Sequence, residues 1–100
     1  MGKIYVIGDK YTTNLYRLLG AEGEVLENPE LLPDRINEIR KREDVELLLI
    51  TYDLYNVVKE KVEEIIAGMK RPLVSIIPSP FSESKPIDTK SLLMKALGFG

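Results

Sequence analysis

The sequence predicts an α/β domain with a four-stranded parallel sheet, and two observations support this prediction. Short apolar segments alternate along the chain with longer segments whose apolar residues recur every three or four positions. The short segments are nearly unbroken apolar runs, which is typical of strands buried on both faces in a parallel sheet. Strands that alternate with helices imply right-handed crossovers, and the most economical strand order is the 2-1-3-4 of receiver-like and flavodoxin-like folds.

The first predicted strand covers residues 3–7 and ends at Gly8 and Asp9, a turn-forming pair. Thr12 or Thr13 can then cap a short helix, because a threonine hydroxyl accepts a hydrogen bond from an amide of the first turn. The apolar stripe of this helix is expected to consist of three leucines, Leu15, Leu18 and Leu19.

A brief second strand and a second helix are expected next. The strand covers residues 21–26, where acidic residues suit the edge of a sheet. The helix is expected to begin at Pro33, since proline is tolerated in a first turn, and to end near residue 42 among cations that complement the helix dipole. Its core-facing residues recur at spacings of four and three: Leu32, Ile36 and Ile39.

The next segments are expected to form the clearest strand, the longest helix and the last strand. The two strands cover residues 45–50 and 73–77. One continuous helix is predicted to run from Leu54 to Gly68, with its charged residues on the outer face. Its apolar stripe comprises Leu54, Val57, Val58, Val62, Ile65 and Ile66.

The chain is expected to divide into an α/β domain, residues 1–77, and a terminal segment, residues 78–100. The terminal segment begins with a stretch rich in proline and serine, which is typical of a linker. A short helix capped by Asp88 is predicted after it. The apolar stripe of that helix comprises Leu92, Leu93, Ala96 and Leu97. So short a helix is marginal alone in water, so this stripe must either fold back on its own sheet or bind another protein.

Composition excludes several kinds of chemistry. The chain has no cysteine and no histidine, which rules out disulfides, thiolate nucleophiles, Ser-His-Asp triads and ordinary zinc sites. Its 14 Lys+Arg and 16 Asp+Glu give a net charge of −2, so nucleic acid is not an expected partner. The longest apolar run, residues 47–50, is far shorter than the roughly 20 residues that cross a bilayer. A cytoplasmic chain without direct membrane insertion is expected.

Three polar residues at the expected carboxyl edge of the sheet are candidates for chemistry: Asp9, Thr51 and Asp53. Open α/β sheets bind ligands at this edge, yet the chain has neither a P-loop nor a Gly-x-Gly-x-x-Gly motif. All three residues are also suited to capping or to local turns, and this interpretation is favoured. We therefore expect no catalytic, cofactor-binding or metal-binding residues.

Tyrosines can gather at the same rim. Tyr11, Tyr52 and Tyr55 follow the ends of the first and third strands, and aromatic residues are enriched in the cores of protein interfaces. Ordinary half-buried tyrosines are an equally good interpretation. The candidate partner-binding residues are therefore Leu92, Leu93, Leu97, Tyr52 and Tyr55.

A succession of short motifs resembles a known family. The motifs are Ile7-Gly8-Asp9 followed by Thr12 and Thr13, then Arg17-Leu18-Leu19-Gly20, Leu49-Ile50-Thr51, Ile76-Ile77-Pro78-Ser79-Pro80 and Pro86-Ile87-Asp88. Their order and spacing resemble the F subunit of the V-type (A-type) ATP synthases of archaea and bacteria, over essentially the whole chain. The sequence departs from this family at Leu15 and Tyr16, where Gly-Phe is common.

The resemblance implies a non-catalytic component of the central rotor stalk of a rotary ATPase. It implies a receiver-like fold that binds the coiled-coil axle, which is the D subunit of the complex, inside the catalytic ring and couples ATP turnover to ion movement. A terminal helix that extends or retracts, and so affects hydrolysis, is also implied. The protein would be cytoplasmic and peripheral to the membrane, as part of the complex.

Two other classes remain open at this point. A stand-alone receiver-like signalling module would be phosphorylated on aspartate, with Asp9 and Asp53 around a magnesium ion. A small hydrolase or transferase is disfavoured, because no general base suited to neutral pH is visible without histidine.

Overall fold

The sheet has the predicted topology. The computed structural model describes residues 2–78. Its four strands are all parallel and lie in the order β2-β1-β3-β4. The elements in chain order are β1 (Lys3–Gly8), α1 (Lys10–Leu18), β2 (Glu22–Val25), the 3₁₀ turn η1 (Pro29–Leu31), α2 (Leu32–Arg40), β3 (Val45–Thr51), α3 (Tyr52–Val57), α4 (Lys59–Ala67) and β4 (Leu73–Ile77).

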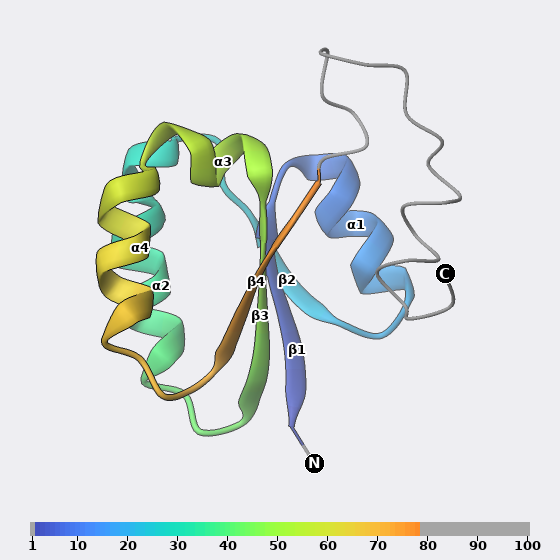
Figure 1. Ribbon diagram of the computed structural model, residues 1–100. Coiled ribbons are helices and arrows are strands. Elements are labelled where there is room, and N and C mark those ends of the chain that lie inside the picture. The colour runs from blue at the N-terminus through green and yellow to red at the C-terminus, as the bar shows by residue number, and fades with distance from the viewer. Residues whose placement is uncertain (1, 79–100) are drawn as a thin grey trace.

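The helices lie on both faces of the sheet (Figure 1). The connection from β1 to β2 runs in the opposite direction along the sheet from the later two, so right-handed crossovers place α1 on one face and α2, α3 and α4 on the other. The larger core lies under the latter helices. It includes Ile7, Leu48 and Ile50 from the central strands, and the predicted stripe of α2, Leu32, Ile36 and Ile39. The prediction for α2 is thus confirmed.

The prediction for the first helix is wrong in its cap and in its buried face. Asp9 caps α1 in place of a threonine, and its carboxylate accepts a hydrogen bond from the backbone amide of Thr12 at 2.8 Å. The residues of α1 buried against the sheet are Thr12, Thr13 and Tyr16, whereas Leu18 is 85% exposed.

Close contact between α1 and the sheet explains this orientation. A β-carbon added to Gly23 would lie 3.1 Å from Cγ2 of Thr13, and one added to Gly8 would lie 3.4 Å from Oγ1 of the same residue. Thr13 therefore lies directly over two glycines of the strands. Leucine is larger than threonine, so the leucines of α1 face away from this contact.

The single long helix predicted from Leu54 to Gly68 is divided in two. Val58 has φ −123° and ψ 33°, outside the helical range, and separates α3 from α4. No glycine or proline marks the break in the sequence. Val57 and Val58 are adjacent β-branched residues, whose helix propensity is low, and Val57 is 62% exposed instead of facing the core.

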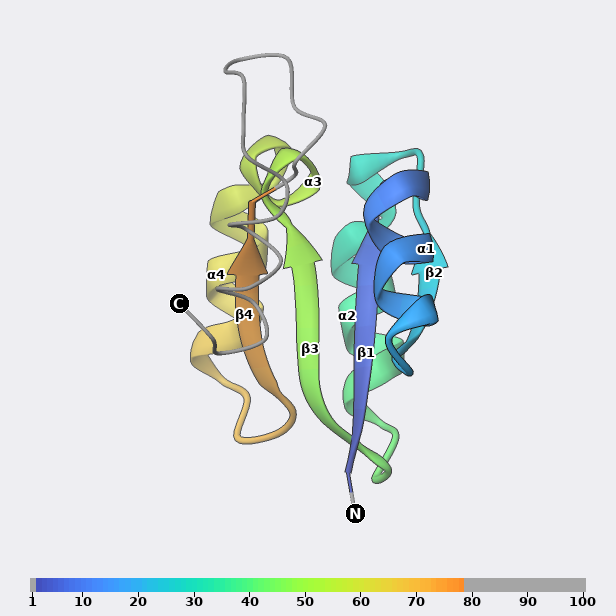
Figure 2. The ribbon, with the colours of Figure 1, turned by 90° about the vertical axis from the view of Figure 1, so that its right-hand side faces the viewer.

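The α1 face of the sheet is only half covered by described helices. Helix α1 packs on β1 and β2, and Figure 2 shows no helix of the described range in front of β3 and β4. The smaller core of this face comprises Val6, Tyr16, Leu49 and Ile77. A four-stranded sheet is about 19 Å wide and a helix is about 10 Å across, so the uncovered half has the width of one helix.

Candidate functional site

The carboxyl edge of the sheet holds Asp9 in a structural role. Its two carboxylate oxygens accept hydrogen bonds from the backbone amide and the hydroxyl of Thr12, both at 2.8 Å. The capping interpretation of Asp9 is confirmed.

Thr51 and Asp53 differ sharply in their surroundings. Thr51 takes the N-cap position of α3, but its side chain makes no capping hydrogen bond, and its buried Oγ1 has no hydrogen-bond partner among residues 2–78. Asp53 lies in the first turn of α3 and is exposed. Within residues 2–78 no group of three or more acidic side chains is arranged to hold a metal ion. The described part of the rim therefore lacks a set of three acidic ligands that could form a receiver-type magnesium site.

The tyrosine pair of α3 is divided between core and surface. The rings of Tyr52 and Tyr55 lie 6.1 Å apart between centroids and are tilted by 46°. Tyr55 is buried and its hydroxyl donates a hydrogen bond to Glu63, which is the main cause of its raised pKa. Tyr52 is 53% exposed. Of this candidate pair, Tyr52 is the residue whose ring is exposed.

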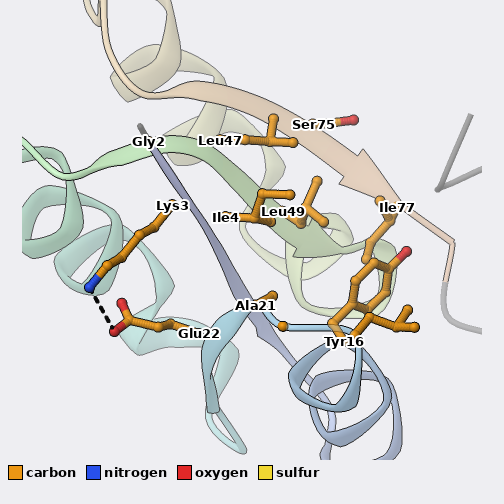
Figure 3. Close-up of a pocket in the computed structure, with 12 residues that line it drawn as sticks. Gly2, Lys3, Ile4, Tyr16, Ala21, Glu22, Leu47, Leu49, Ser75 and Ile77 are labelled. Carbon is orange, nitrogen blue, oxygen red and sulfur yellow. Dashed lines mark hydrogen bonds and ion pairs between the residues drawn. The ribbon is translucent and has the colours of Figure 1, made fainter.

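The α1 face of the sheet carries an apolar groove of about 580 Å³. We call it the sheet groove (Figure 3). Strands β1, β3 and β4 supply its floor, and α1 with the turn after it supplies one wall. Its apolar lining comprises Ile4, Tyr16, Leu19, Ala21, Leu47, Leu49 and Ile77.

Few polar groups reach the sheet groove. Ser75 projects from β4, and Lys3 and Glu22 form an ion pair of 3.5 Å at one end. Burial raises the pKa of the Tyr16 phenol in the wall. Among the described residues that line it, no nucleophile is paired with a base, and the groove is suited to apolar side chains from a helix or a peptide.

Sequence reasoning missed the sheet groove, although a signal for it exists. Alternate residues of β3 and β4 face the α1 side, and Leu47, Leu49 and Ile77 among them are apolar. The chain offers only one helix before residue 78 that can cover this side. Counting helices against sheet faces would have indicated an uncovered apolar strip.

An ionic network surrounds β2. The guanidinium of Arg42 donates two hydrogen bonds to Asp44, at 2.9 and 2.6 Å, and one to Glu22 at 2.9 Å. Arg42 also lies over the ring of Tyr5, 5.5 Å from the centroid, and Arg35 pairs with Glu24 at 2.9 Å. These pairs tie β2 to β1 and to the helix and loop beside it, which stabilises an edge strand of only four residues.

Because of this network, we expect the free energy of unfolding to fall in acid. The hydrogen bonds from Arg42 lower the pKa of Asp44 from 3.8 to about 2, so the folded state holds its charge to lower pH than the unfolded chain does. The unfolded state binds more protons over this interval, and stability therefore falls as the pH falls from about 4 towards about 2.

We expect Asp44→Asn to lose less stability than the wild type when urea unfolding is compared at about pH 6 and about pH 3. Asp53→Asn, which replaces an exposed carboxylate of α3, is the control and should retain the acid loss of the wild type. An unchanged acid loss in Asp44→Asn would contradict the assignment.

The fold and the sheet groove together define a class of protein. It is a receiver-like α/β domain in which Asp9 caps a helix and Thr51 and Asp53 form no catalytic set, and in which the described residues leave an apolar groove uncovered. The chain belongs to the ATP synthase (F/14-kDa) subunit family, whose model matches residues 4–95. A comparison with curated proteins finds no match.

Family membership confirms the resemblance drawn from the sequence motifs. The chain is the F subunit of a V/A-type ATP synthase. It is an accessory component of a rotary ATPase complex that carries out ATP synthesis and ion transport. None of the helices within residues 2–78 is long and apolar enough to cross a bilayer.

Proposed function

We propose that this protein is a non-catalytic part of the central rotor stalk, where it binds the coiled-coil axle (the D subunit of the complex) inside the catalytic ring. In that position it couples or regulates ATP turnover and ion transport, on the cytoplasmic side and peripheral to the membrane. The observation that carries the proposal is an open apolar docking surface in a chain whose family is an accessory component of the synthase. Polar residues at the carboxyl edge that would serve catalysis are used for capping or lie apart.

The terminal segment supplies the regulatory part of this proposal. Its predicted helix carries one apolar stripe, and the sheet groove has the width of one helix and an apolar floor. We assign the groove to this helix in the isolated protein. The stripe, Leu92, Leu93, Ala96 and Leu97, would then be shielded from water by the floor residues of β3 and β4.

The length of the linker permits this arrangement. Ile77, the last residue of β4, lines the sheet groove, so the terminal segment starts at one end of it. Residues 78–87 can span up to about 33 Å when extended, which is about twice the 17 Å length of a five-residue strand. The same reach allows the helix to leave the groove and contact another protein of the complex.

In the assembled complex we propose that Leu92, Leu93 and Leu97 contact the axle or the ring. Tyr52 and Tyr55 are assigned to the partner-binding surface as well, with Tyr52 as the contacting ring and Tyr55 as its support. Apolar contacts should dominate this interface, because exposed ion pairs at an interface rim add little affinity.

Co-expression with the axle protein of the same complex tests the proposal. We expect a stoichiometric pair that elutes as one species in size-exclusion chromatography and stays together on dilution to micromolar concentration. A four-helix bundle of similar length and charge serves as the control partner and should not bind. If the two proteins elute separately, the proposed function is wrong.

A further inference from the structure

Helix α1 has a second apolar face that the sheet does not use. We propose that this outer face, made by Tyr11, Leu15 and Leu18, binds one helix of the axle coiled coil. The three residues are named the α1 stripe below. The inference rests on the proposed function for the identity of the partner, and it adds the surface through which the partner is held.

The exposure of the α1 stripe is the first observation. Leu18 is 85% exposed, the highest value among the large hydrophobic residues of the described chain, and Tyr11 is 64% exposed. Leu15 is half-buried between them. Single exposed hydrophobic residues are common on monomeric proteins, but two exposed residues with a half-buried leucine between them form a continuous strip on one side of this nine-residue helix.

The spacing of the α1 stripe is the second observation. The residues stand at positions i, i+4 and i+7, which brings them within an arc of roughly 60° on the helix surface. The buried side, Thr12, Thr13 and Tyr16, is centred about 140° away, so the two faces are distinct. Anchors at i, i+4 and i+7 are the pattern through which a helix contacts a second helix, and steps of four and three are those of a coiled-coil seam.

The charge of α1 is the third observation. The helix contains Lys10 and Arg17 and no acidic residue, although the whole chain has a net charge of −2. Lys10 is exposed beside the stripe, and Arg17 donates a hydrogen bond from its guanidinium to the backbone carbonyl of Gly23. A partner helix whose apolar seam is flanked by carboxylates complements this surface, and acidic flanking positions are common in coiled coils.

The α1 stripe continues into a surface already described. Leu19, next to Leu18, forms part of the wall of the sheet groove. A coiled-coil helix on the stripe would therefore lie beside the groove that we assign to the terminal helix. Other exposed apolar residues of the described chain lie singly on strands, as Leu73 does on β4, or on other helical elements, as Val57 does on α3 and Leu31 on η1.

Affinity measurements with the purified axle protein test the assignment. Leu18→Ala removes the contact, and Leu18→Glu also places a negative charge against the expected acidic flank. We expect at least about tenfold weaker binding for Leu18→Glu and a smaller loss for Leu18→Ala, because central apolar anchors carry most of the affinity of an interface. Val57→Glu is the matched control, since it adds the same charge at an exposed apolar position on α3. Its affinity should equal that of the wild type.

Thermal midpoints test whether the variants fold, and the wild-type complex tests whether the axle is the partner. All three variants alter exposed side chains, so their thermal midpoints should stay within a few degrees of the wild-type value. A wild-type complex that Leu18→Ala and Leu18→Glu leave at full affinity would overturn the α1 assignment alone. Absence of any wild-type complex would overturn the proposed function, and the axle as occupant of the stripe with it.

Discussion

Replacing Gly8 with alanine is expected to lower the free energy of unfolding by about 1–3 kcal/mol, the usual cost of inserting a methyl group into a well-packed core. Gly8 ends β1 at the centre of the sheet, and a β-carbon there would clash with Cγ2 of Thr51 on β3. Its distance from Oγ1 of Thr51 would be 3.2 Å, which is also tight. Both residues are held by strand pairing, so neither can move away cheaply.

A second substitution makes the cause of this loss testable. Thr51→Ser removes the Cγ2 methyl group, so the double variant Gly8→Ala/Thr51→Ser should recover part of the stability lost in Gly8→Ala. Urea unfolding of the four proteins gives the coupling free energy, which we expect to be about 1 kcal/mol in favour of the double variant. Strictly additive losses would show that the clash with Cγ2 is not the cause.

Gly68→Ala is the matched control for the backbone. Gly68 has φ −94°, a value open to any residue, and the nearest atom to an added β-carbon is the carbonyl oxygen of Ile65 at 3.8 Å. Alanine there meets only ordinary contact, so its stability should lie within about 0.5 kcal/mol of the wild type. The difference between the two glycines separates a steric cost from the general effect of replacing glycine.

The sequence determines most of this fold because its local patterns and its topology agree. The apolar runs of β1, β3 and β4 and the stripe of α2 required no tertiary information to find. The order 2-1-3-4, taken from these alternating strands and helices as the most economical topology, is the order observed. These elements are the ones in which the hydrophobic period, the length and the flanking residues all point to the same structure.

Tertiary contact decided the two features that were predicted wrongly. The leucines of α1 have the period of a core-facing stripe, but the glycines beneath the helix leave room for Thr13 and not for a leucine. The break at Val58 has no glycine or proline, and the low helix propensity of two adjacent valines weakens a helix without fixing where it ends. Hydrophobic periodicity alone therefore indicates neither the buried face of α1 nor the position of the break.

The candidate site was only partly predictable for the same reason. The exposed ring of Tyr52 follows from its place just after a strand, and the capping role of Asp9 follows from its residue type. The sheet groove instead depends on which half of a face lacks a helix. The α1 stripe depends on which face of α1 packs against the sheet. The predicted contacts of Leu92, Leu93 and Leu97 lie outside the described residues and stay predictions.

The absence of cysteine allows a direct test of where the terminal segment lies in the isolated protein. Ser75 lines the sheet groove, and Ser75→Cys can be paired with Leu92→Cys, Leu93→Cys or Leu97→Cys in turn. If the terminal helix occupies the groove, at least one pair should oxidise rapidly to an intramolecular disulfide, since the bond requires Cα atoms within about 7 Å. Lys59→Cys on α4, paired with the same partners, is the control on the opposite face and should not cross-link.

Removing the apolar stripe of the terminal segment is expected to change both assembly and the ATPase rate. Replacing Leu92, Leu93 and Leu97 together with serine keeps the length of the chain, and truncation after Pro80 removes the stripe and the helix. The described core lies within residues 6–77, so both variants should fold. We expect each to change the affinity for the rest of the complex by at least about fivefold, equivalent to about 1 kcal/mol, and to alter the ATPase rate of the assembled enzyme.

The comparison between these two variants identifies the part of the segment that acts. Equal effects would show that the three leucines account for the role of the whole segment, because serine substitution leaves the backbone in place. A loss confined to the truncated protein would assign the role to length or to the other side chains. Wild-type assembly and wild-type ATPase rate in both variants would mean that the terminal segment has no part in the complex, and the regulatory half of the proposed function would then be wrong.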